Sequence, residues 1–187
     1  MKNLILSSFV FFTVTFNMFT QELSPYIKIG ESTESITELS EKVISVLKEN
    51  SFTVLGTYNP CNKSSLKIIA FTRTDLSNVS IKVKDRGALA AVFKVGFVKK
   101  NDKVIISYTN PDYILRAYLR DNYNTYRSTF KTFSADLKTV FSAIGNEFTP
   151  FGGTVQADKL RKYHYKILMP YFSDPVVLNE FPSFEEV

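Results

Sequence analysis

The sequence predicts an α+β fold in which short strands and amphipathic helices share one domain. Runs of β-branched and aromatic residues at 52–58 and 66–72 favour strands. Between residues 36 and 47, apolar side chains recur at steps of three and four, which predicts a helix with one apolar stripe. A chain of 187 residues, 44% of them hydrophobic, is long enough to bury one sizeable core.

The most apolar and most regular part of the chain runs from residue 85 to residue 123. We predict a turn at 85–87, a strand over 89–98 and a return strand over 104–108, which together form a hairpin. The alanines leave the first of these strands ambiguous between helix and strand. Its valines and phenylalanines, together with Gly96, favour the strand.

Helix starts are marked by capping residues. Ser35 and Glu38 have the spacing of a capping box, and Asn110 with Pro111 suits the N-cap and first position of a second helix. The remaining expected elements are a strand at 27–29 ended by Gly30, a helix at 127–144 ended by Gly145, and a short helix at 155–160.

Residues 1–21 have the pattern of a signal peptide or a short N-terminal anchor. A short basic leader precedes an uncharged apolar run of 13 residues, 4–16, which is too short to span a bilayer comfortably. We therefore expect a periplasmic or secreted protein in which residues 22–187 form a single α+β domain. An uncleaved leader would allow peripheral association with a membrane.

Charge and cysteine content limit the partners and the means of stabilisation. The net charge is +5 and the lysines are scattered rather than arranged in a stripe, so we expect no nucleic-acid partner. Cys61 is the only cysteine, which excludes an intramolecular disulfide. The hydrophobic core must therefore supply the stability of the domain.

The end of the chain repeats a pattern from its beginning. Residues 183–186 have the capping-box spacing of residues 35–38, again after a short strand-like segment. This repetition predicts a pseudo-repeat whose C-terminal unit, from about residue 163, is incomplete.

The best candidates for a polar site lie in or beside the central stretch. Arg116 and Arg120 are one helical turn apart, and a guanidinium pair suits either a carboxylate or phosphate ligand or a structural ion-pair cluster. Both interpretations stay open from the sequence. The candidate ligand-binding residues are Asp85, Arg86, Asn110, Tyr113, Arg116 and Arg120.

The sequence favours no catalytic residue. Cys61 and His164 have no local partner with the spacing of a nucleophile and its base, and no clustered metal-ligand spacing is visible. We expect no cofactor and lean against an enzyme. The exception would be His164 acting as an axial ligand to haem or to a metal ion.

The element order and three motifs resemble the "domain of unknown function 302" family over residues 26–187. The motifs are DRG at 85–87, NPDY at 110–113 and AYLR at 117–120. The resemblance, in particular to an extracytoplasmic bacterial branch, implies an antiparallel sheet with helices packed on one face, of the TATA-binding-protein-like kind. It implies no activity, and fold analogy alone is no evidence of DNA binding.

Three classes of function follow. The first is non-catalytic binding of a small apolar or anionic ligand, in an apolar pocket between sheet and helices with Arg116 and Arg120 at its mouth. The second is a protein-interaction or envelope-structural module with an envelope protein as partner, for which a homodimer would be a marker. The third is a haem- or metal-dependent protein that uses His164.

Overall fold

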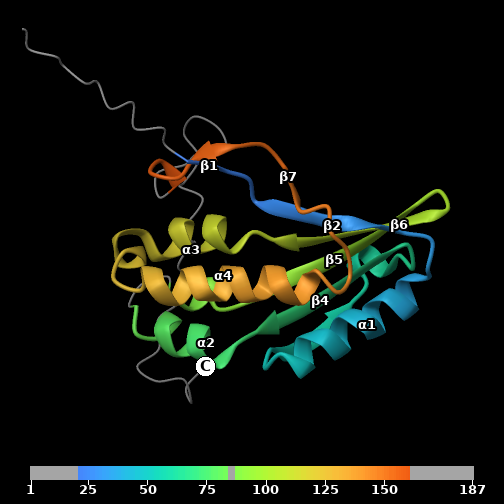
Figure 1. Cartoon of the computed structure of the whole chain (residues 1–187), viewed down its shortest axis with the longest axis horizontal. Helices are drawn as coiled ribbons and strands as arrows, with labels where there is room; N and C mark the ends of the chain where they lie inside the picture. The colour runs from blue at the N-terminus through green and yellow to red at the C-terminus, as the bar shows by residue number, and fades with distance from the viewer. Residues whose placement is uncertain (1–20, 84–86, 161–187) are drawn as a thin grey trace, which may run out of the picture.

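The structure, a computed structural model, describes residues 21–83 and 87–160 (Figure 1). The N-terminal leader, the Asp85-Arg86 turn, His164 and the C-terminal unit from residue 163 lie outside these residues, so the expectations about them stay predictions.

A six-stranded sheet has the order β3-β4-β5-β6-β2-β7, and every neighbouring pair is antiparallel. A separate two-stranded ladder pairs β1 with β8, also antiparallel. With its four helices, this part of the chain has the α+β fold that the sequence predicts. The strands are β1 (Glu22–Leu23), β2 (Tyr26–Ser32), β3 (Thr53–Tyr58), β4 (Leu66–Thr72), β5 (Phe93–Lys100), β6 (Lys103–Thr109), β7 (Thr149–Phe151) and β8 (Val155–Gln156).

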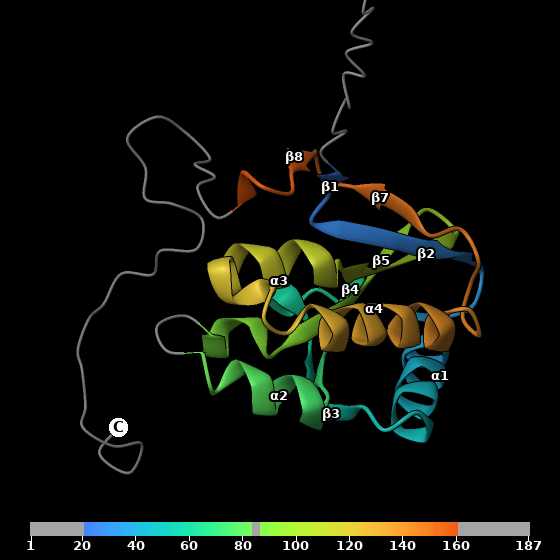
Figure 2. The same ribbon diagram turned by 60° about the vertical axis from the view of Figure 1, so that its left-hand side comes forward.

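Helices cover one face of the large sheet, as Figures 1 and 2 show for α1 and α4. Within residues 21–83 and 87–160, no helix is long and apolar enough to cross a membrane. The helices are α1 (Ile36–Glu49), α2 (Thr74–Ser80), α3 (Pro111–Leu119) and α4 (Arg127–Phe141), with 3-10 turns at Pro60–Asn62, Gly87–Ala90 and Arg120–Tyr123.

The core forms where alternate strand residues meet the apolar stripes of the helices. In β5, Phe93, Val95 and Phe97 point inward and are buried, as the two-residue period of a strand requires. All four helices contribute to the same cluster. Its largest fully buried side chains are Phe71, Phe93, Phe97, Phe130, Phe133 and Phe141. These rings fill the layer between sheet and helices, where we expected an apolar ligand pocket.

The predicted helix starts are present in detail. The Ser35 hydroxyl accepts a hydrogen bond from the Glu38 N–H at 3.2 Å, and the Glu38 carboxylate accepts one from the Ser35 N–H at 3.0 Å. This second bond lowers the pKa of Glu38. The Asn110 side chain likewise accepts from the Asp112 N–H at 3.2 Å.

Three predicted elements differ from the structure because of neighbours distant in sequence or because of local turns. Strand β2 continues through Gly30, which pairs with Ile106, to Ser32, and its register against β6 shifts between Lys28 and Gly30. The alanine-rich start of 89–98 lies in a 3-10 turn, and β5 begins only at Phe93. The segment 155–160 opens with strand β8, because Leu23 and Val155 pair in the small ladder.

Gly145 holds the chain after α4 close to strand β2. A Cβ atom at this position would lie 2.7 Å from the Ile29 carbonyl oxygen, which also accepts a hydrogen bond from the Glu147 N–H at 2.9 Å. The glycine therefore permits a close approach. It does not end the helix as we expected, because α4 ends at Phe141 and Ser142 is its C-cap.

Gly145→Ala is expected to lower the free energy of unfolding by about 1–3 kcal/mol, because backbone atoms must move to admit the methyl group. Urea denaturation measures the change. Gly56→Ala is the matched control, since a Cβ atom there meets no atom within 4 Å. Equal effects of the two substitutions would contradict the close-approach explanation.

Candidate functional site

A polar hollow of about 520 Å³ lies where the end of α3 and the start of α4 meet the segment that follows β8. We call it the arginine pocket, because three of its lining residues are arginines. Its described lining residues are Gln21, Arg116, Arg120, Asp121, Tyr123, Asn124, Arg127, Ala157 and Asp158. Arg116 and Arg120 thus line the same hollow, and their role in binding a ligand stays a prediction.

Among the described residues, Arg116 is held in place by an aromatic ring rather than by an acid. Its guanidinium lies 4.2 Å from the centre of the Tyr123 ring, within the range of a cation–π contact. The Tyr123 hydroxyl donates to Asp112 at 3.1 Å, and burial raises the pKa of Tyr123, so this donor stays protonated. The Nε atom of Arg116 is buried and has no hydrogen-bond partner among the described residues.

Arg120 has a backbone conformation that is rare for a residue with a side chain. Its φ is 50° and its ψ is −121°, where α3 gives way to the 3-10 turn. Non-glycine residues in such regions cost about 1–3 kcal/mol each and are often found at functional sites. Arg120 therefore adopts a costly geometry at the wall of the arginine pocket.

Arg127 brings the third guanidinium and a helix end to the same hollow. It is the first residue of α4, and its N-cap, Tyr126, makes no side-chain capping bond. An uncapped N-terminus carries a partial positive charge and unused N–H groups. Asp121 and Asp158 lie on the lining too, so the pocket combines three cationic side chains with two acidic ones.

The other predicted site residues lie elsewhere. Asn110 is buried and ties α3 to the N-terminal segment: its side-chain amide donates to the Ser24 carbonyl at 2.8 Å, and its N–H donates to the Pro25 carbonyl at 2.8 Å. Tyr113 packs in a small apolar cluster. Asp85 and Arg86 lie outside the described residues, as does His164. Across the described residues, no group of three or more potential metal ligands occurs.

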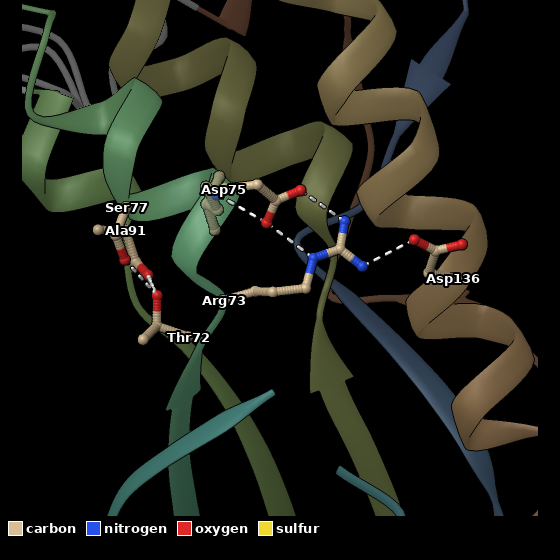
Figure 3. A network of polar contacts seen from close by, with 7 residues as sticks. Thr72, Arg73, Asp75, Ser77, Ala91 and Asp136 are labelled. Carbon is tan, nitrogen blue, oxygen red and sulfur yellow. Dashed lines mark hydrogen bonds and ion pairs between the residues drawn. The ribbon is translucent and has the colours of Figure 1, made fainter. Parts of the chain in front are cut away.

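A second polar centre, around Arg73, was not anticipated from the sequence (Figure 3). The Arg73 guanidinium binds Asp75 through Nε and Nη2 at 2.8 and 2.9 Å, and Asp136 through Nη1 at 2.7 Å. It also lies about 5 Å from the rings of Phe52 and Phe133. Asp136 is 63 residues away on α4, so no local pattern could reveal this pairing.

The Arg73 network is self-contained, which indicates a structural clamp. Both carboxylates are already engaged by the one guanidinium, whose side chain is only 12% exposed. Burial alone would raise the pKa of Asp75, but the hydrogen bonds and charge of Arg73 more than offset this and lower it. The clamp joins the end of β4 and the start of α2 to α4.

A second hollow, about 590 Å³ in volume and largely apolar, lies on the face of the sheet opposite α1 and α4. We call it the open-face groove. Its lining includes Ile68, Gly96 and Ile105 from the sheet and Ile114 and Tyr118 from α3. Arg116 and Arg120 are not part of this lining, so the described structure separates the apolar hollow from the arginines that we expected at its mouth.

Fold and site together define an α+β domain with an arginine-lined pocket. No known family model matches the chain, and no curated protein matches it. Among solved structures, it is similar to the crystal structure of an uncharacterized conserved protein, DUF302, from Bacillus stearothermophilus, at 12% sequence identity and a TM-score of 0.43. That likeness covers 64% of this chain and 92% of the other, and at this level it says nothing about a ligand or a location.

Arg73→Met is expected to lower the free energy of unfolding at pH 7 by about 1–3 kcal/mol, because two partly exposed carboxylates lose their shared partner. The lowered Asp75 pKa contributes stability that is present above the unfolded-state value, about 3.9, and is lost as the pH falls through the folded-state value. The difference from wild type should therefore shrink below about pH 4.

Urea unfolding curves across this pH range measure the Arg73 effect. Lys42→Met is the control, because the Lys42–Glu34 pair is exposed and such pairs contribute about 0–1 kcal/mol. A loss of stability that does not change with pH would indicate that Arg73 acts through packing alone.

Arg120→Gly is expected to be more stable than Arg120→Ala by about 1–2 kcal/mol, because both remove the side chain but only glycine relieves the backbone conformation. Thermal or urea unfolding of the two variants measures the difference directly. Equal stability would show that the backbone at residue 120 carries no strain.

Proposed function

We propose that the protein is a non-catalytic binding protein whose arginine pocket takes a small anionic ligand, a carboxylate or a phosphate. The observation that carries the proposal is the convergence of Arg116, Arg120 and Arg127 on one hollow, with the Arg116 Nε buried and unpartnered among the described residues.

The energetics of Arg116 support an external acceptor. A buried N–H without a partner costs about 1–3 kcal/mol, and a bound anion would supply an acceptor once the Arg116 side chain turns this N–H toward the pocket. The planar guanidinium fork matches a carboxylate or phosphate in geometry as well as charge. Because the Tyr123 ring already holds Arg116, less side-chain freedom is lost on binding.

The lining of the pocket favours binding over catalysis. Among its described residues there is no serine, cysteine, histidine or lysine to act as a nucleophile or as a base near neutral pH. Asp121 and Asp158 are exposed carboxylates, which suit selection between ligands better than proton transfer. A carboxylate on the pocket lining would repel an anion of high charge more strongly than an anion of low charge, and so would favour the latter.

We place this activity outside the cytoplasm, as the signal-peptide-like pattern of residues 1–21 suggests. N-terminal sequencing of the protein from fractionated cells tests this part of the proposal. Recovery of the uncleaved chain in the cytoplasmic fraction would contradict it, without bearing on the arginine pocket.

Calorimetric titration with inorganic phosphate and, separately, with succinate tests the binding proposal. Arg116→Ala and Arg127→Ala are each expected to lower the affinity for the anion by about 10- to 100-fold, because each variant loses one or two charged hydrogen bonds. Lys48→Ala, which removes an equal charge from the exposed face of α1, should leave the affinity unchanged.

The two titrations also distinguish the ligand classes, since either anion can bind without the other. The proposal fails if neither binds more tightly than about 10 mM. It fails equally if Lys48→Ala weakens binding as much as the pocket variants, because the attraction would then come from overall charge.

A further inference from the structure

The open-face groove lies on the sheet surface opposite α1 and α4, and residues of α3 contribute to its lining. Outward-pointing residues of β4, β5 and β6 form its floor, and Figures 1 and 2 show α1 and α4 on the other side of the sheet. Antiparallel sheets with one face in water normally carry polar residues on that face. Here five of the eight exposed large hydrophobic side chains among the described residues line the groove: Tyr26, Leu89, Val92, Val98 and Phe151.

The groove has the shape of a trough. Gly96 and Ser107 are paired across β5 and β6 at its floor, and a Cβ atom on Gly96 would have its nearest neighbour, the Ile68 side chain, at 3.4 Å. Larger side chains stand on either side, including the stacked rings of Tyr26 and Phe151 with centroids 5.5 Å apart. Small residues between large ones leave room for side chains from another segment.

We propose that residues 161–187 of this chain pack against the open-face groove. The proposal is independent of the arginine pocket and of any ligand bound there. It commits to a segment of the same chain rather than to a second copy or an apolar ligand, for three reasons of position, composition and charge.

The described chain ends beside the groove. Leu160, its last residue, is fully buried in a small cluster with Leu23 and Tyr113. Ile114 packs against this cluster and also lines the groove. A single side chain, that of Ile114, therefore links the cluster around Leu160 to the lining of the groove.

The following segment has enough length and apolar surface to cover it. Its 27 residues could extend about 90 Å, whereas the outer strands of a six-stranded sheet lie about 24 Å apart. Thirteen of these residues are apolar or aromatic. Tyr163, Tyr165 and Ile167 alternate with other residues, which is the pattern of a strand with one apolar side.

Charge also favours this occupant. Residues 161–187 hold four of the 18 acidic residues and three of the 23 basic ones, so their net charge is −1 and that of residues 1–160 is +6; all four acidic residues follow the last basic one, Lys166. Lys94 is the charged side chain among the described groove residues. The acidic, apolar part of the segment after Lys166 is attracted to such a surface, while a second copy of this basic chain would be repelled.

Photo-crosslinking in the full-length protein tests the proposal. p-Benzoylphenylalanine replaces Val98, which lines the groove, and mass spectrometry identifies the crosslinked peptides. We expect crosslinks within one chain to residues 161–187, and none to this segment from a probe at Lys42 on the exposed face of α1. Crosslinks from residue 98 between two chains, or to a co-purified lipid, or no crosslink at all, would each overturn the proposal.

Filling the trough provides an independent check. Gly96→Leu occupies the floor of the groove, and Gly96 is not among the glycines with positive φ, so the backbone tolerates a side chain. In the full chain this substitution should abolish most of the crosslinking from residue 98 and increase hydrogen exchange in residues 161–187. Unchanged exchange in that segment, with crosslinking intact, would contradict packing in the groove.

Discussion

Phe71 on β4 contacts three other phenylalanine rings: Phe52, Phe93 and Phe141, with centroids 5.8, 6.3 and 6.2 Å away. This aromatic layer is the contact on which the remaining structure depends. Burial of large aromatic rings is among the strongest contributions to the stability of a small domain. With one cysteine, this chain cannot add the stability of an intramolecular disulfide. Once these rings face the helices, the two-residue period of each strand commits every alternate side chain to the opposite face.

The same layer places the arginine pocket. Helix α3 buries Leu115 and Leu119 in the core, which turns Arg116 and Arg120 toward the side where α4 begins. Phe130 and Phe133 of α4 are buried in the core, and their packing places the uncapped first turn of α4 beside α3. The arginine pocket therefore results from the way α3 and α4 pack together. The partial positive charge at the N-terminus of α4 adds to the charge of the arginines.

Two arginines that lie over aromatic rings have opposite electrostatic surroundings. Arg73 lies near Phe52 and Phe133 and is also paired with Asp75 and Asp136, so these two carboxylates neutralise its charge within the fold. Arg116 lies over Tyr123, and no acid pairs with it in the described structure. Stacking alone does not neutralise a guanidinium. The comparison identifies Arg73 as part of the framework and Arg116 as the residue suited to an external anion.

The sequence by itself determined what depends on neighbours a few residues apart: the capping box at Ser35, the N-cap at Asn110, the stripes of α1 and α4, and the one-turn spacing of Arg116 and Arg120. Tertiary structure alone decided what depends on distant segments. Asn110 binds Ser24 across 86 residues, and Arg127 joins the arginine pocket only because α4 packs beside α3. Local hydrogen bonds and helical periodicity depend on residues close together in the sequence. Side chains from distant segments meet only when the whole core is packed.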